Sequence, residues 1–169
     1  MLRTAGKFPN NLQFMRAITI EKFGGPDVFR EAQIPLPELR PGHLLVRVLA
    51  SSVNPVDCKV RSGMIPAIAP PFPAVLGCDV AGVVEAVGDG VTKFSAGDEV
   101  YFCAGMTGRF GGALAEFCLV DAAQVAKKPA SLGFAAAAAL PLVTITAWDG
   151  LIDRARVGAG MDVLVHGAT

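Results

Sequence analysis

The alternation of hydrophobic and polar positions predicts short β-strands through the first part of the chain. Residues 15–20 alternate and are rich in β-branched side chains, a pattern typical of a half-buried strand. The turn-forming residues 24–27 follow, and residues 28–34 return as a second strand. Residues 44–53 form a longer apolar stretch, in which Arg47 is expected to face outward. This part of the chain is therefore expected to be mainly β.

The middle of the chain continues in the same style. Three further β-rich stretches, 80–87, 99–103 and 113–120, are separated by turns that contain glycine. Several short strands at this spacing are typical of a small β-barrel or sandwich.

One helix is expected between the strands. Asn54 is a favourable N-cap and Pro55 suits the first helical turn, where its missing N–H costs nothing. The helix should end near Ser62–Gly63, and residues 65–73 contain four prolines, which exclude regular structure there.

The pattern changes after Pro129. Ser131 is expected to cap a helix that runs to Leu140, and a second helix should run from Pro141 to about Arg154. A glycine turn then leads into an apolar stretch, residues 161–166, which predicts a buried strand. Helices followed by a buried strand are the beginning of an α/β sheet.

Composition and charge exclude several classes of function. Of the 169 residues, 52% are hydrophobic and 18% are charged, with 15 basic and 15 acidic side chains, which is typical of a folded protein. There is no basic stripe, so nucleic acid is not an expected partner. No apolar run approaches the ~20 residues of a membrane span, so no membrane partner is expected.

The cysteines do not form a metal-binding or disulfide pattern. No two of them are as close as in a CxxC pair, and only His43 and His166 could add imidazole ligands. Reduced thiols and a cytoplasmic location are therefore expected. The four cysteines are Cys58, Cys78, Cys103 and Cys118.

Six motifs, taken in order, resemble one family. They are Ser52–Gly63 (like VNPVDxKxRxG), Gly77–Val84 (GxDxAGxV), Phe94–Tyr101 (FxxGDxV), Gly111–Phe117 (GGxxAEY), Leu140–Trp148 (LPLxxxTAW) and Val163–Ala168. Together they resemble the zinc-free medium-chain dehydrogenase/reductases of the quinone oxidoreductase and alkenal reductase kind.

The resemblance implies a fold that is mainly β with α. It comprises a GroES-like β-barrel catalytic domain followed by the truncated start of a Rossmann α/β domain. The expected organisation is an N-terminal extension (1–14), a catalytic domain (15–135), and linker helices with a first Rossmann strand (136–169). The glycine-rich phosphate loop is expected to follow Thr169, so the isolated chain is expected to bind cofactor weakly and to reduce nothing.

The resemblance also implies chemistry. It implies a reductase that transfers hydride from NADPH, with NADH as the alternative, to a quinone or to the activated C=C bond of an α,β-unsaturated carbonyl. Zinc alcohol dehydrogenases carry Cys and His where this chain has Asn54 and Cys78, so no metal and no zinc are expected. The full-length protein is expected to be a homodimer. The alternatives are a zinc alcohol dehydrogenase relative and a non-enzymatic GroES-like module for binding or self-association.

Four residues are candidates for the site. Negative charge develops on the substrate oxygen during hydride transfer, so hydrogen-bond donors are needed there. Asn54 and Lys59 are the catalytic and cofactor-binding candidates, although Asn54 could serve only as the helix cap and Lys59 could be a solvated surface lysine. Thr146 and Gly167 are cofactor-binding candidates, although a threonine within a helix often bonds to its own backbone.

Overall fold

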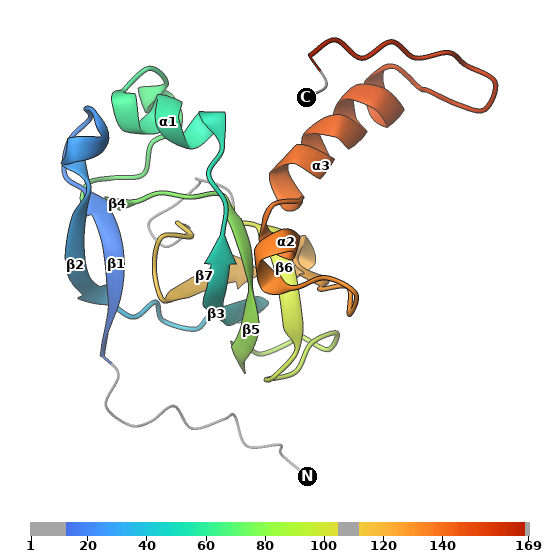
Figure 1. Ribbon diagram of the computed structural model, residues 1–169. Coiled ribbons are helices and arrows are strands. Elements are labelled where there is room, and N and C mark those ends of the chain that lie inside the picture. Colours follow the sequence, from blue (N-terminus) through green and yellow to red (C-terminus); the bar gives the residue numbers. More distant parts are fainter. Residues whose placement is uncertain (1–12, 105–111, 168–169) are drawn as a thin grey trace.

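The computed structural model describes residues 13–104 and 112–167, and these form two β-sheets with short helices around them (Figure 1). The smaller sheet has the order β2 (Arg30–Pro35), β1 (Phe14–Ile20) and β4 (Ala74–Val75). The larger sheet has the order β7 (Phe117–Asp121), β3 (His43–Ser51), β5 (Asp79–Val87), β6 (Glu99–Cys103) and β8 (Ala126–Lys127). All the pairings are antiparallel.

The segment before β7 joins the two sheets into a barrel. On one side the Ile18 N–H donates to the Leu114 carbonyl at 2.8 Å, and the Glu116 N–H donates to the Arg16 carbonyl at 3.1 Å. On the other side the Val48 N–H donates to the Glu116 carbonyl at 2.9 Å. Residues 114–116 therefore bond to β1 and β3 at once, and the predicted β-barrel is confirmed.

The barrel interior is filled by aliphatic and aromatic side chains. Its main cluster contains Leu44 and Val46 of β3 and Val80 and Val84 of β5, all at most 1% exposed, with Phe102 of β6. Burial of this apolar surface is the main favourable contribution to folding. A second cluster packs the first helix against the smaller sheet, and a third packs α2 (Phe134–Ala138) on the outer face of the larger sheet (Figure 1).

The helix predicted after Asn54 is present. α1 (Pro55–Ser62) begins after Asn54 and ends at Gly63, whose φ of 80° is the left-handed conformation that favours glycine at a helix end. In the first turn the Asp57 carboxylate accepts a hydrogen bond from the Asn54 backbone N–H at 2.7 Å. The proline-rich segment that follows contains only the short 3₁₀ turn Pro66–Ile68, as expected from its prolines.

Three predicted strands have boundaries that differ by two or more residues. The stretch predicted as a strand over 113–120 forms one only over Phe117–Asp121 (β7), because residues 113–116 form a bend with one isolated bridge. The second strand begins at Arg30 rather than at residue 28, because Pro26–Val28 forms a 3₁₀ turn closed by the Phe29 N–H and the Pro26 carbonyl. The third strand ends at Ser51 because the chain then turns into α1.

The C-terminal part extends away from the barrel as an arm (Figure 1). It comprises α3 (Pro141–Trp148), the π-helical turn Asp149–Arg154 and an extended stretch to residue 167. The predicted second helix is therefore confirmed to Arg154.

Two predictions about this region are wrong. The helix before Pro141 begins at Phe134 with Gly133 as its cap, not at Ser131, because residues 129–132 form a turn whose carbonyls accept bonds from Lys128 Nζ. The predicted strand 161–166 is not a strand, because no described neighbouring strand pairs with it.

Some predictions lie outside the described residues. These concern most of the N-terminal extension (residues 1–12), Gly111 and the last two residues. No helix in the described part of the chain combines the length and apolar character that a membrane span requires.

Gly82 provides a test of the barrel packing. An added Cβ there would lie 2.2 Å from the Arg47 carbonyl oxygen, which belongs to the paired backbone of β3. We expect Gly82→Ala to lower the free energy of unfolding by about 1–3 kcal/mol, measured by urea denaturation. Gly150→Ala is the matched control, because nothing lies within 4 Å of its Cβ position. Equal stability of the two variants would contradict this packing.

Candidate functional site

A buried carboxylate lies at the junction of the barrel and the arm. Asp79, the first residue of β5, is 0% exposed. Its Oδ2 accepts hydrogen bonds from Ser52 Oγ at 2.7 Å and from Asn54 Nδ2 at 3.0 Å. Its Oδ1 accepts a bond from the Leu142 backbone N–H at 2.9 Å. We call this group of four residues the Asp79 junction.

The junction is stable because three donors replace the water that the carboxylate loses on burial. The Leu142 N–H belongs to the first turn of α3, where unpaired N–H groups and the helix dipole favour a negative charge. One carboxylate therefore connects the loop after β3, the start of β5 and the start of α3. The chain separation of 63 residues between Asp79 and Leu142 hides this contact from sequence reasoning.

Asn54 is placed at the junction, and its amide nitrogen is already occupied. Nδ2 donates to Asp79 and also to Ser52 Oγ at 3.2 Å, and the side chain is 5% exposed. An amide nitrogen has two hydrogens, so both are used within the protein. Donation to a substrate would require the loss of one of these bonds.

A second carboxylate and a thiol lie directly behind the junction. Burial raises the pKa of Asp57, which is opposed by the hydrogen bond from the Asn54 N–H. Cys78 Sγ donates to Asp57 Oδ1 at 3.4 Å. The hydrogen bond with Cys103 and burial raise the pKa of Cys78, so this thiol is held in its protonated form.

The other candidates lie on the helices around the junction. Lys59 is exposed on α1, and no hydrogen bond or ion pair of its side chain occurs among the described residues. Thr146 is exposed on α3, one turn after Leu142, and its hydroxyl donates to the Leu142 carbonyl at 2.8 Å. Gly167 lies near the end of the arm with φ of 73° and nothing within 4 Å of its Cβ position. The structure thus links Asn54 to the helix of Thr146 and leaves Gly167 apart.

Asn54 is the one junction member among the four predicted site residues, so the sequence did not identify Ser52, Asp79 or Leu142. The one signal available was an acidic residue in the otherwise apolar stretch 76–84, because a buried charge needs partners. Among the described residues, no group of three or more His, Cys, Asp or Glu side chains could hold a metal ion.

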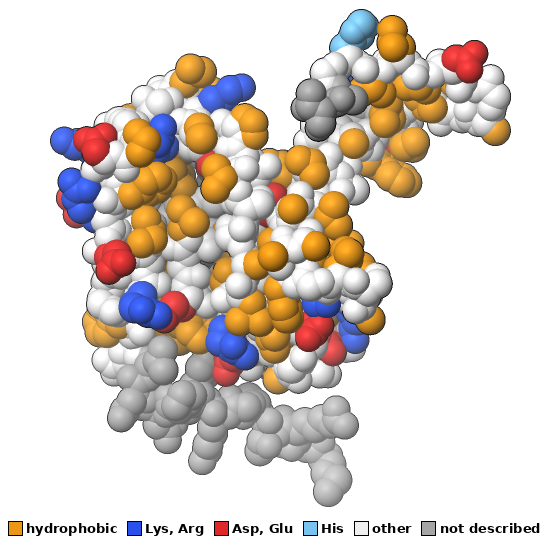
Figure 2. Space-filling model, viewed as in Figure 1, with side chains coloured by type: hydrophobic (Ala, Val, Ile, Leu, Met, Phe, Trp, Pro, Cys, Tyr) orange, Lys and Arg blue, Asp and Glu red, His pale blue; other side chains and the backbone are white. Residues whose placement is uncertain are grey.

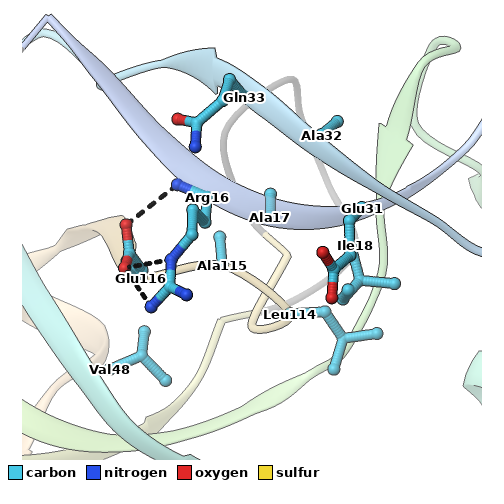
Figure 3. Close-up of a pocket in the computed structure, with 10 residues that line it drawn as sticks. All are labelled: Arg16, Ala17, Ile18, Glu31, Ala32, Gln33, Val48, Leu114, Ala115 and Glu116. Atoms are coloured by element: carbon cyan, nitrogen blue, oxygen red, sulfur yellow. Dashed lines mark hydrogen bonds and ion pairs between the residues drawn. The ribbon is translucent and has the colours of Figure 1, made fainter.

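A cavity lies away from the junction, between the β1–β2 hairpin and residues 114–116 (Figure 3). Its volume is about 480 Å³, and Ala32, Val48 and Leu114 contribute to its walls. At one side the Glu116 carboxylate accepts from the backbone N–H and the Nε of Arg16, both at 2.9 Å. This ion pair fixes the segment that closes the barrel, and none of the four predicted site residues lines the cavity.

The fold and the junction define a GroES-like barrel followed by the start of an α/β domain. The Alcohol dehydrogenase GroES-like domain profile matches residues 40–130, and the chain belongs to this family.

Two curated relatives match the chain over nearly its whole length. The NADPH-dependent alkenal/one oxidoreductase (chloroplastic) of Arabidopsis thaliana is 41% identical over 156 residues, which is 89% of this chain and 40% of the relative. The human quinone oxidoreductase is 39% identical over 158 residues, 93% of this chain and 46% of the relative. The resemblance to quinone oxidoreductases and alkenal reductases is thus confirmed. The chain spans about half the length of the curated relatives that it matches.

A solved structure supports the same family assignment. An alcohol dehydrogenase superfamily protein from Novosphingobium aromaticivorans superposes with a TM-score of 0.79 at 45% sequence identity. The match covers 85% of this chain and 43% of that structure.

The junction predicts a large effect of one isosteric change. Asp79→Asn keeps the shape but leaves one oxygen and one NH₂ group facing three donors, so a buried donor loses its acceptor. We expect the free energy of unfolding to fall by roughly 3 kcal/mol, measured by urea denaturation. Asp121→Asn is the matched control, because Asp121 caps an exposed turn through one bond to the Ala123 N–H at 2.8 Å. Comparable losses in both variants would contradict the role of the junction.

The Arg16–Glu116 pair predicts a pH dependence. The backbone N–H and guanidinium of Arg16 hold the pKa of Glu116 below its ordinary value. Because the pKa is lower in the folded state, the stabilisation is present above the unfolded pKa of about 4.3 and is lost as the pH falls through the folded pKa. We expect Glu116→Gln to lower the melting temperature at pH 7 and to flatten the acid limb of a stability–pH curve. Glu31→Gln is the control, because Glu31 lines the same cavity. It should change neither the melting temperature at pH 7 nor the acid limb of the curve.

Proposed function

We propose that this chain provides the substrate-facing barrel of an NADPH-dependent reductase that acts on quinones or on the C=C bond of α,β-unsaturated carbonyls. The observation that supports it most strongly is the Asp79 junction, which joins the loop of Asn54 to the first turn of α3. The names of the relatives, an alkenal/one oxidoreductase and quinone oxidoreductases, support the two substrate classes.

The described residues fit part of a nicotinamide cofactor. Lys59 and Thr146 are exposed on helices that begin at the junction. The Lys59 ammonium could donate to a cofactor hydroxyl, and the Thr146 hydroxyl, whose hydrogen bonds to the Leu142 carbonyl, could accept from one. Gly167 leaves its backbone open to the approach of a phosphate group. When bound, NADPH would supply the hydride. NADH remains the alternative, because no described residue discriminates between the two.

We assign different tasks to the two catalytic candidates. As hydride reaches the substrate carbon, negative charge develops on its oxygen, and a nearby cation or donor stabilises that charge. The Lys59 ammonium is the group available for this task, since no described side chain pairs with it. Asn54, whose nitrogen is occupied, holds the start of α1 against Asp79 and so positions Lys59 on the same helix.

We also propose that the site works without zinc. Asn54 and Cys78 stand where zinc alcohol dehydrogenases carry Cys and His, so the zinc-ligand set of those enzymes is not present at these two positions. Elemental analysis of the purified protein tests this proposal, and stoichiometric zinc would instead favour the zinc alcohol dehydrogenase alternative. The four free thiols support a reducing compartment, for which we propose the cytoplasm. For the full-length protein we propose a homodimer.

The activity is best tested in a chimera. Residues 13–167 would replace the matching part of human quinone oxidoreductase, and NADPH oxidation would be followed with a 1,4-quinone and with an α,β-unsaturated ketone. We expect Lys59→Met to lower kcat about 10²–10³-fold. Lys93→Met, at another exposed lysine, should leave kcat unchanged. A chimera that folds and binds NADPH but reduces neither substrate would overturn the proposal.

One observation favours a second candidate function, self-association without catalysis. The arm exposes many apolar side chains (Figure 2), and an exposed apolar surface of this kind favours association with another molecule. They include Val143 (52% exposed), Ile145 (56%), Trp148 (59%), Val163 (47%) and Leu164 (80%). Light scattering of the 169-residue chain distinguishes the two, since a clean monomer that binds no hydrophobic dye would exclude this second candidate.

A further inference from the structure

A small cavity lies beside α1, apart from the groups assigned to catalysis. Its volume is about 180 Å³, and the side chains of Phe29, Val53, Leu76 and Leu114 give it apolar walls. Neither Lys59 nor Thr146 lines it. We call it the α1 cavity.

Arg61, in the last turn of α1, is half-buried and lines this cavity, and one donor of its guanidinium is unsatisfied. Its Nε is buried and has no hydrogen-bond partner, and it is the only such side-chain nitrogen or oxygen in the part of the chain that the structure describes. No carboxylate of a described residue forms an ion pair with Arg61; its guanidinium lies 6.0 Å from the centre of the Phe29 ring. A buried guanidinium donor without an acceptor is costly, so this group favours the binding of an anion.

The other polar side chains at the cavity are mostly engaged elsewhere. Ser52 Oγ donates to Asp79, and the two oxygens of Asp57 accept from the Asn54 N–H and from Cys78 Sγ. The charge that lacks a partner is therefore positive, while the surrounding walls are apolar. The Asp57 carboxylate lines the same cavity and repels a dianion such as phosphate more strongly than a monoanion. A planar monocarboxylate satisfies the guanidinium edge with two parallel hydrogen bonds.

We propose that the α1 cavity binds a small monocarboxylate with a compact apolar body, such as an aromatic or branched carboxylic acid. Arg61 binds the carboxylate, and Phe29, Leu76 and Leu114 surround the apolar body. This site is independent of the reductase function, since neither NADPH nor Lys59 takes part. Cys58, an exposed thiol that also lines the cavity, reports on its occupancy.

Benzoate is the probe for the test, titrated by calorimetry against the 169-residue chain, with neutral benzamide as its isostere. We expect saturable binding of benzoate, at least tenfold weaker binding of benzamide, and slower alkylation of Cys58 by iodoacetamide when benzoate is present. Arg61→Met should weaken benzoate binding at least tenfold. Arg47→Met is the matched control, because Arg47 pairs with Glu85 on the barrel surface, and it should bind benzoate as the unaltered chain does.

Four results would overturn the proposal. They are no saturable binding of benzoate, equal binding of benzamide, displacement of benzoate by equimolar inorganic phosphate, and unchanged affinity in Arg61→Met. If Arg61→Met does not fold, Arg61→Lys replaces it, since lysine keeps the charge but loses the planar fork and should weaken binding by a smaller factor. The protection of Cys58 in the unaltered chain gives an independent readout that requires no variant.

Discussion

The burial of one carboxylate without a cationic partner is the constraint on which the arrangement depends. Asp79 is fully buried, and it is acceptable there only because Ser52, Asn54 and Leu142 direct three donors at it. These donors come from three separate parts of the chain. The loop after β3, the start of β5 and the start of α3 must therefore assemble together, because a shift of any of them would remove donors from a buried charge.

The barrel holds Asp79 of this junction in a fixed position. β5 is buried along most of its length because the barrel interior lies on one side and α2 packs on the other. Residues 114–116 bond to both sheets, and the Arg16–Glu116 pair fixes them. The start of β5, where Asp79 lies, is thus held by a rigid scaffold, as functional groups generally require.

The same constraint changes the interpretation of the candidate site. Asn54 is committed to the protein, so its contribution is to orient α1. On this helix Lys59 is exposed and its side chain has no hydrogen-bond or ion-pair partner among the described residues, and Arg61 lines the α1 cavity with an unpaired Nε. The two faces of one short helix therefore carry different chemistry. One is proposed to stabilise charge on a substrate, and the other to bind a carboxylate.

The sequence by itself determined most of the local structure. The strands of the barrel follow from short alternating or apolar β-rich stretches, and α1 follows from Asn54, Pro55 and Gly63, because these signals act over a few residues. The family and the mainly β fold were likewise accessible from the ordered motifs. The structure of residues 161–166 could not be predicted from the sequence, since a strand forms only where a neighbouring strand supplies hydrogen bonds. Only the tertiary structure decided which donors face Asp79 and which cations stay unpaired, because these contacts join residues far apart in the chain.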